Sequence, residues 1–178
     1  TNPADIVADY VRKGLGLERN RVFGTGTLLD TARLIRTLSE ESGVGRRSIQ
    51  AYSLGEHGDS SMIPFSSVTI GGLPFDAYDI SKEKVLEATR QIGMTIIEGK
   101  KSTEFGIGRA LTEMAACILR DEKKIMPASV LLQGEYGQHD VHCGVPCLIG
   151  KNGIEKIIEL PLTEEEQEML KQSCEVIK

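Results

Sequence analysis

The sequence predicts an α+β fold in which an antiparallel sheet packs against long helices. Helical and strand-like segments are mixed along the chain without the strict alternation that builds a parallel sheet. Three β-rich runs, separated by turns that contain glycine, follow one another at 125–132, 141–149 and 154–160 and indicate an antiparallel meander. A chain of this length can bury about 70% of its extended surface. We therefore expect one domain over residues 1–178.

The first part of the chain predicts two amphipathic helices. Pro3 suits a first helical turn, and apolar residues recur at helical spacing over 6–11 before the helix ends by Gly16, so one face of this helix should be buried. The short run at 21–23 is typical of a strand. Apolar spacing then predicts a second helix over 28–43.

The middle of the chain predicts shorter elements and then the longest helix. Residues 48–54 resemble a strand, and 62–75 suggest a turn of helix, a strand and a hairpin-like loop. The helix that begins at Ser81 continues to Gly99. Its interior Gly93 costs about 1 kcal/mol relative to Ala, so we expect a close packing contact there.

Two further helices are expected in the second half. A polar break at 100–106 precedes a helix over 107–120. The last helix follows the three β-rich runs, where Thr163 and Glu166 match the residue pattern of a capping box.

Composition excludes several classes of protein. The net charge is -5, and the basic residues form no long block, which argues against nucleic acid as a partner. No apolar run reaches membrane-spanning length. The four cysteines fall in or beside apolar patterns without a dense disulfide framework, so we expect reduced thiols and a cytoplasmic protein.

The strongest candidate for chemistry is His57, one of three histidines, in the loop Gly55-Glu56-His57-Gly58-Asp59-Ser60. Imidazole can give and take a proton near neutral pH, and flanking glycines let a backbone approach a substrate closely. For a single His in a loop, a surface or hydrogen-bonded structural histidine is the favoured interpretation. The rest of the chain has to separate the two.

Two charged residues on the predicted second helix are possible partners. Asp30 and Arg33 are three residues apart and share a face. Asp30 could orient the His57 ring, and Arg33 offers a planar fork for a carboxylate. Spacing alone fits an exposed helix ion pair better.

Two other sequence patterns give only weak evidence for a binding site. His139, His142, Cys143 and Cys147 resemble a zinc site superficially, but they lack the tight pairs of structural zinc, so no metal site is predicted. Gly24-Thr25-Gly26 lacks the third glycine of a dinucleotide fingerprint.

Several motifs, in order along the chain, resemble the NAD-dependent L-lactate dehydrogenase family. They are Thr1-Asn2-Pro3, Gly24-Thr25-Gly26-Thr27-Leu28-Leu29-Asp30-Thr31-Ala32-Arg33, the His57 loop, Ser102-Thr103-Glu104-Phe105-Gly106-Ile107-Gly108, and Gly144-Val145-Pro146. The resemblance implies the family's C-terminal substrate-binding and catalytic domain over 1–178. Because the chain opens on Thr1 without Met, we expect a piece of a longer protein that lacks the family's N-terminal dinucleotide-binding domain.

The resemblance also implies roles for seven residues. His57 would be the proton donor and acceptor, Asp30 its carboxylate partner, and Arg33 the clamp for the substrate carboxylate. Substrate contacts would come from Asn2 and Thr103 as well, whereas Asn2, Thr25 and Ile107 would lie on the side of the NAD cofactor. These roles fit a reaction in which protonation of a keto oxygen accompanies hydride arrival.

The implied function is the interconversion of (S)-lactate and pyruvate with NAD, as in glycolysis and fermentation, by an oxidoreductase that is a homotetramer in the family. Glu56 and Thr103 resemble lactate rather than malate enzymes. Malate and branched 2-hydroxyacid dehydrogenases are the alternatives in the same class. NAD-dependent glycosidases are similar in fold, but the intact His57 loop argues against them. In isolation the chain would be an inactive assembly module, because it has no hydride source.

One departure from the family concerns regulation. Family members activated by fructose 1,6-bisphosphate resemble one another in an Arg two residues after the substrate Arg and a His seven before the catalytic one. Here these positions are Ile35 and Gln50, and neither is a cation. We therefore expect no activation by that sugar phosphate.

Overall fold

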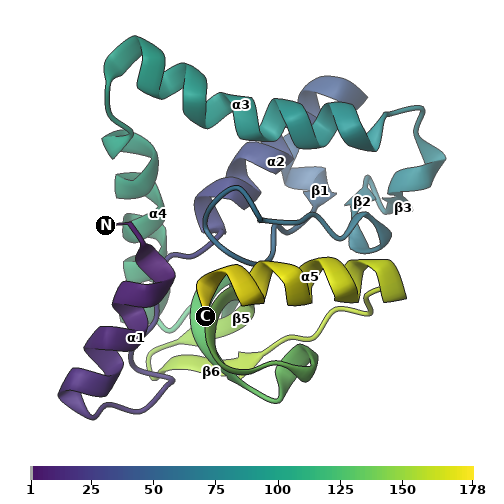
Figure 1. The fold of residues 1–178 in the computed structure, drawn as a ribbon. Coiled ribbons are helices and arrows are strands. Elements are labelled where there is room, and N and C mark those ends of the chain that lie inside the picture. Colours follow the sequence, from purple (N-terminus) through teal and green to yellow (C-terminus); the bar gives the residue numbers. More distant parts are fainter. Residues whose placement is uncertain (1) are drawn as a thin grey trace.

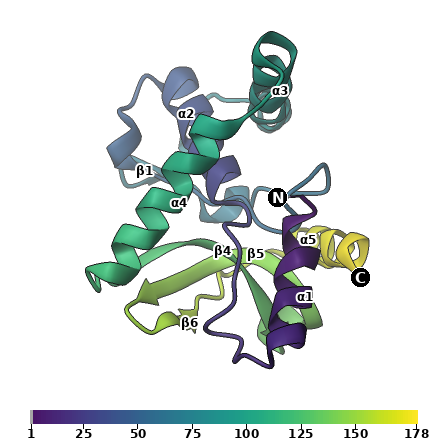
Figure 2. The ribbon, with the colours of Figure 1, turned by 90° about the vertical axis from the view of Figure 1, so that its left-hand side faces the viewer.

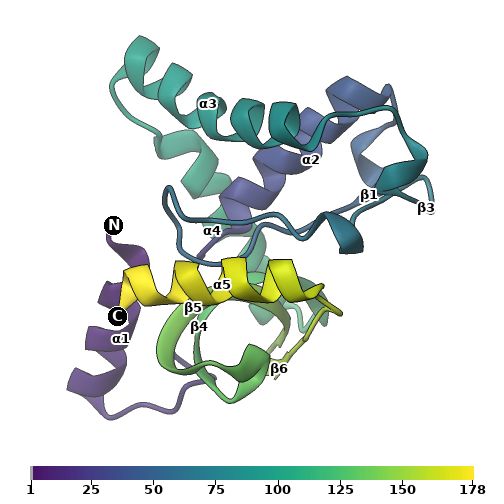
Figure 3. The ribbon, with the colours of Figure 1, turned by 45° about the vertical axis from the view of Figure 1, so that its right-hand side comes forward.

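The computed structural model describes residues 2–178 and forms two layers (Figure 1). Thr1, the first residue of the Thr1-Asn2-Pro3 motif, lies outside them. One layer holds a three-stranded sheet with helices packed on it, and the other holds a smaller three-stranded sheet beside two long helices. Figure 3 shows the loop after β1 running between the two layers.

The larger sheet is the predicted antiparallel meander. Its strands β4 (Lys124–Gln133), β5 (His139–Gly150) and β6 (Gly153–Ile157) are hydrogen-bonded in that order, with Ser129 opposite Gly144. Residues 126–132 of β4 and 141–147 of β5 are buried on both faces, because α1 (Ala4–Leu15), α4 (Glu104–Leu119) and α5 (Glu164–Ile177) all pack on this sheet.

The second layer has its own core. The helices α2 (Leu28–Ser42) and α3 (Lys82–Lys100) pack together beside a small antiparallel sheet of β1 (Ile49–Gln50), β2 (Thr69–Ile70) and β3 (Leu73–Pro74). Its buried apolar side chains include Leu34, Leu38, Val68, Ile70 and Val85. The α+β fold with long helices is therefore confirmed.

Local signals account for most helix ends. The first two α helices stop at Gly16 and Gly43, both in the left-handed conformation. The hydroxyl of Ser81 caps α3 by accepting the Lys84 N–H, and the predicted capping box of Thr163 and Glu166 begins α5. Helix α4 begins three residues before the expected Ile107, at Glu104.

One predicted strand is absent and another is shorter than expected. The run at 21–23 is not a strand; the neighbouring Gly24 makes only an isolated bridge to Ser129. Of residues 48–54, only Ile49 and Gln50 pair with a strand, because the chain then leaves the small sheet and the N–H of Ser53 donates to the hydroxyl of Thr31 in α2. A side chain replaces the strand partner there.

The prediction that the apolar face of α1 is buried is also wrong for the described residues. Its apolar stripe, Ile6, Val7, Tyr10 and Val11, is 38–75% exposed, and the buried positions are Asp5 and Ala8. Figure 2 shows α1 at the edge of the molecule, with one side against the large sheet. The apolar periodicity identified one face of the helix, but it did not show whether that face contacts the rest of the protein. Within residues 2–178 no helix is long and apolar enough to cross a membrane.

Candidate active site

A cavity of about 500 Å³ lies between the two layers. Its walls come from α2, α3, the start of α4, the loop around His57 and the residues just before α1. All seven residues singled out in the sequence line it: Asn2, Thr25, Asp30, Arg33, His57, Thr103 and Ile107. Segments far apart in the chain therefore meet at one place.

In the cavity wall, Asp30 contacts both His57 and Arg33. His57 Nδ1 lies 2.6 Å from Asp30 Oδ2, and Arg33 Nη1 donates to Asp30 Oδ1 at 3.0 Å. These side chains are only 16–22% exposed, so their interaction is screened less than that of a surface pair. Spacing alone suggested an exposed ion pair of Asp30 and Arg33 on the helix. In the structure, these two residues and His57 form a partly buried triad.

The environment of His57 favours its charged form. The hydrogen bond to Asp30 is the main cause that raises the pKa of His57 above its usual 6.5, and the charges of Asp30 and Asp5 add to it, against burial and Arg33. Within residues 2–178, Nε2 of the ring makes no hydrogen bond. This nitrogen is free to exchange a proton with a molecule in the cavity.

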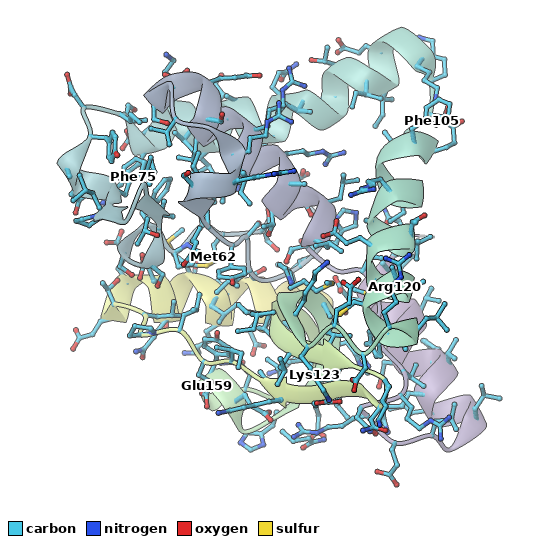
Figure 4. All side chains as sticks on the ribbon, turned by 180° about the vertical axis from the view of Figure 1, so that it is seen from behind. Met62, Phe75, Phe105, Arg120, Lys123 and Glu159 are labelled. Atoms are coloured by element: carbon cyan, nitrogen blue, oxygen red, sulfur yellow. The ribbon has the colours of Figure 1, made fainter. Side chains whose placement is uncertain are left out.

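The loop that carries His57 is fixed at both ends and from the opposite layer. Leu54 pairs with Met62 to close it, and Met62 lies between the layers (Figure 4). Gly55 pairs with Gly144 of β5, has a φ of 95°, and approaches Ser173 of α5 so closely that a Cβ would lie 2.3 Å from the Ser173 hydroxyl. The glycine before Glu56 is thus required by both backbone conformation and space.

The same hydroxyl holds the next residue of the loop. Ser173 Oγ accepts the N–H of Glu56 at 2.8 Å, and the Glu56 carboxylate in turn accepts the N–H of Ser60 at 3.3 Å and the Ser60 hydroxyl. Glu56 therefore folds back on its own loop.

Helix α3 supports the arginine of the triad. Gly93 packs against the Arg33 guanidinium, where an added Cβ would lie 3.3 Å from Nη1. The close contact predicted for this helix-interior glycine is present. Apart from its bond to Asp30, the guanidinium makes no hydrogen bond within residues 2–178. Its remaining N–H groups can bind an anion.

Two residues of the site were not singled out from the sequence. Asp5 of α1 accepts the backbone N–H of His57 at 3.0 Å and is 4% exposed. Arg90 of α3 donates to the backbone carbonyls of Asp59 and Ser61 at 2.9 and 3.3 Å and lines the cavity. Asp5 lies two residues after the Asn2-Pro3 motif, but in the sequence it belongs to the polar face of a helix.

The residues of the zinc-like pattern lie in different surroundings. Cys143 and Cys147 are fully buried, and the Sγ atom of Cys143 lies 3.4 Å from that of Cys174 on α5, which is outside the pattern. Burial is the main cause that lowers the pKa of His142, whereas His139 is exposed at the other end of the pattern. In the part of the chain that the structure describes, no three metal-ligating side chains converge.

This arrangement joins three capabilities. A cationic imidazole can donate a proton, a carboxylate orients it, and a partly buried guanidinium can bind a carboxylate in two-point contact. The cavity can thus hold a small carboxylic acid beside an acid–base group.

Comparisons with known proteins agree on one family. Residues 27–178 match the model of the lactate/malate dehydrogenase, alpha/beta C-terminal domain. An L-lactate dehydrogenase of Fusobacterium nucleatum is 44% identical over 187 aligned residues, which cover 100% of this chain and 59% of that protein. The chain thus spans 59% of the length of this relative.

Solved structures show the same similarity. A lactate dehydrogenase from a Medee basin deep-sea metagenome superposes with a TM-score of 0.94 at 38% identity, covering 99% of this chain and 59% of that chain. The malate dehydrogenase of Aeropyrum pernix gives a TM-score of 0.92 at 38% identity, over 99% of this chain and 60% of that one.

Proposed function

Because the chain belongs to the lactate/malate dehydrogenase family and contains its C-terminal domain, we propose that it forms the substrate and acid–base site of an NAD-dependent 2-hydroxyacid dehydrogenase that interconverts (S)-lactate and pyruvate. The observation that carries the proposal is the contact of Asp30 with both His57 and Arg33 inside one cavity. The N-terminal dinucleotide-binding domain would be supplied by the rest of a longer protein.

In the proposed reaction Arg33 binds the substrate carboxylate. Its free N–H groups match the two carboxylate oxygens and hold the keto group near His57. Thr103 and Asn2 line the same cavity and complete the polar contacts. Fixing the substrate in this way lowers the entropic part of the barrier.

His57 then acts as the acid. As negative charge develops on the keto oxygen, the imidazolium donates its Nε2 proton to that oxygen. Asp30, hydrogen-bonded to Nδ1, fixes the ring orientation and stabilises the positive charge before transfer. In the direction of hydroxyacid oxidation, neutral His57 accepts the hydroxyl proton.

The residues at the cavity suit a nicotinamide cofactor. Ile97 and Ile107 provide apolar surface, and Thr25 and Asn2 provide polar groups beside it, a combination that fits a flat ring carrying one amide. When bound, NADH supplies the hydride that the side chains of this chain cannot. The isolated 178-residue chain is accordingly expected to have no turnover.

The substrate distinguishes two candidate functions within the family. Glu56 and Thr103 support lactate, whereas the similarity to a malate dehydrogenase structure supports malate as the second candidate. Steady-state kinetics of the full-length protein with pyruvate, oxaloacetate and 2-ketoisocaproate separate these, and we expect the highest kcat/KM with pyruvate.

The remaining parts of the proposal concern partners and regulation. We infer a homotetramer, supported by exposed apolar side chains on α1, α3 and α4, and a reducing compartment such as the cytoplasm, supported by the four buried free thiols. Ile35 is partly buried in the smaller core and Gln50 is exposed on β1. We therefore still predict that fructose 1,6-bisphosphate does not activate the protein.

The acid–base role is tested by His57→Asn in the full-length protein. We expect kcat for keto-acid reduction to fall by about two to four orders of magnitude, because Asn cannot donate a proton at neutral pH. The control is His139→Asn, an exposed histidine of β5, which should keep normal kinetics. A normal rate in His57→Asn would remove His57 from the mechanism.

A further inference from the structure

Asp5 is a buried acid in contact with the loop of His57. It is the second residue of α1, and its side chain is 4% exposed. One carboxylate oxygen, Oδ2, accepts the backbone N–H of His57 at 3.0 Å. The other, Oδ1, is buried and makes no hydrogen bond with the described residues. A buried carboxylate oxygen without a hydrogen-bond partner costs folding free energy.

Within the described part of the chain, Asp5 lacks the cationic partner that a buried carboxylate usually has. Among residues 2–178 no Lys or Arg forms an ion pair with it. Burial is the main cause that raises the pKa of Asp5 above its usual value. The hydroxyl of Ser129 on β4 opposes this shift but makes no hydrogen bond of good geometry with Asp5. An acid in the first turn of a helix is stabilised by the helix dipole, but an exposed side chain receives that stabilisation without the cost of burial.

The group that gains from the Asp5 charge is the His57 imidazolium. The Asp5 charge raises the pKa of His57, and the His57 charge lowers the pKa of Asp5, so each favours the charged form of the other. His57 therefore contacts two carboxylates, Asp30 through its ring Nδ1 and Asp5 through its backbone N–H.

Other charged or titratable groups surround the pair. Arg33 of α2 lowers the pKa of His57, and Glu56 in the loop raises that of Asp5. Arg90 of α3 lines the cavity. The Asp5 charge also acts on the pKa values of the Cys143 thiol on β5 and the Cys174 thiol on α5. Of these groups, Asp5 is the only one besides Asp30 that hydrogen-bonds His57 within residues 2–178.

We propose that Asp5 is a positioning residue for the acid–base reaction: it holds the backbone of His57 in place and supplies a second negative charge that keeps the imidazole protonated. This inference rests on the proposed function, in which the imidazolium is the acid. It adds a contribution from α1, the helix that directly follows the Asn2-Pro3 segment at the cavity.

The test is Asp5→Asn in the full-length protein. The amide oxygen can still accept the His57 N–H, but the negative charge is gone. We therefore expect the pH profile of activity to change while the fold is kept. We measure kcat/KM at saturating NADH against pH, with whichever of pyruvate, oxaloacetate and 2-ketoisocaproate the protein reduces fastest. The alkaline limb of the profile should move to lower pH by about one pH unit, which is about a tenfold loss on the alkaline side.

Two comparisons separate this role from a structural one. A merely structural defect lowers kcat/KM by the same factor at every pH, and that result would overturn the inference. Asp9→Asn makes the same chemical change on the same helix, at a side chain bonded to Arg12 and Lys13 instead. Its profile should keep the wild-type alkaline limb, and an equal shift in Asp9→Asn would also overturn the inference.

Further measurements keep the proposed function and this inference apart. Full activity in His57→Asn contradicts the proposed function itself, whereas an inactive His57→Asn together with a pH-independent loss in Asp5→Asn contradicts only the role of Asp5. Circular dichroism verifies folding. If Asp5→Asn does not fold, Asp5→Ser replaces it, and failure of both to fold assigns Asp5 to structure alone and overturns its role toward His57.

Discussion

At the scale of single residues, the site depends on charges that are held close together and partly away from water. Asp30 bonds both the His57 ring and the Arg33 guanidinium, and all three side chains are less than a quarter exposed. In such surroundings each charge determines the protonation and the orientation of its neighbours. Two predictions belong to this scale.

The first prediction concerns pH. The pKa of His57 is raised mainly by its hydrogen bond to Asp30, so the acid form persists above the usual value of 6.5. Keto-acid reduction by the full-length protein should be constant below the folded-state pKa and fall as pH rises through it. Protonated His57 also stabilises the folded protein. This contribution is fully present below the pKa that His57 has in the unfolded chain, and it is lost as pH rises above the pKa that His57 has in the folded protein. The kcat/KM profile is the measurement, and an alkaline limb below pH 6.5 contradicts the raised pKa.

The second prediction is that Arg33→Lys weakens substrate binding. Lys keeps the charge but lacks the planar fork, so a two-point contact with the carboxylate becomes a single one. Loss of a charge-assisted hydrogen bond of about 1.5–3 kcal/mol corresponds to a fall in kcat/KM of about ten- to a hundredfold. Arg36→Lys is the matched control, because Arg36 lies on the same helix in an exposed pair with Glu40. Equal effects of the two substitutions would contradict a special role for Arg33.

At the scale of elements, each helix contributes a different part of the site. Helix α2 carries Asp30 and Arg33, α5 anchors the loop through Ser173, and α1 reaches it through Asp5. Helix α3 contributes space, because Gly93 leaves room for the Arg33 guanidinium. A change on a helix can therefore affect activity and stability in opposite directions.

Gly93→Ala should show such a division. Replacing a helix-interior glycine with Ala favours the helix by about 1 kcal/mol, but the new methyl group meets the guanidinium at 3.3 Å and shifts it. We expect Tm to be unchanged or higher while kcat/KM for the keto acid falls several-fold, about 1 kcal/mol of transition-state binding.

Gly99→Ala is the control for this substitution. It makes the same replacement in α3 at a position where an added Cβ meets nothing within 4 Å. Helix stability should rise without any change in kcat/KM. If Gly93→Ala retains full activity, the contact with Arg33 does not limit catalysis.

At the scale of the whole molecule, several large apolar side chains of the described residues are exposed at the surface. Phe105, at the corner between α3 and α4, is 82% exposed (Figure 4), and Leu119 at the end of α4 is 85% exposed. The apolar stripe of α1 adds further exposed apolar side chains to these two. Such surface is expected to be covered by other parts of a longer protein or by further copies.

The corresponding prediction is that the isolated chain of 178 residues self-associates. Burying the exposed apolar side chains of α1 and α4 removes them from water at about 25 cal/mol per Å², so light scattering should give a mass above that of a monomer. Replacing Phe105 and Leu119 with Glu should reduce the association, while Lys156→Glu on β6, an exposed polar position, should not. A monomer at micromolar concentration in the unsubstituted chain contradicts the prediction.

Local signals were sufficient for the order and most limits of the elements. Periodic apolar residues, the serine and threonine caps, and glycines at the helix ends act within a few residues, so they are readable in one sequence. The meander of β4 to β6 and the packing contact at Gly93 were predicted on the same basis. The run at 21–23 and most of 48–54 failed as strands, because a strand needs a partner that only the fold can supply.

By itself, the sequence determined the fold class, the helices and the glycine loop that presents His57, and its motifs identified the family. Tertiary structure decided which side chains meet: Asp30 is 27 residues from His57 along the chain, Asp5 is 52 away, and Ser173 is 117 residues from the Glu56 N–H that it holds. It also decided that α1 buries an acid and exposes its apolar stripe. The physical reason is that propensity and capping are local, whereas burial and electrostatic partners depend on which elements pack together.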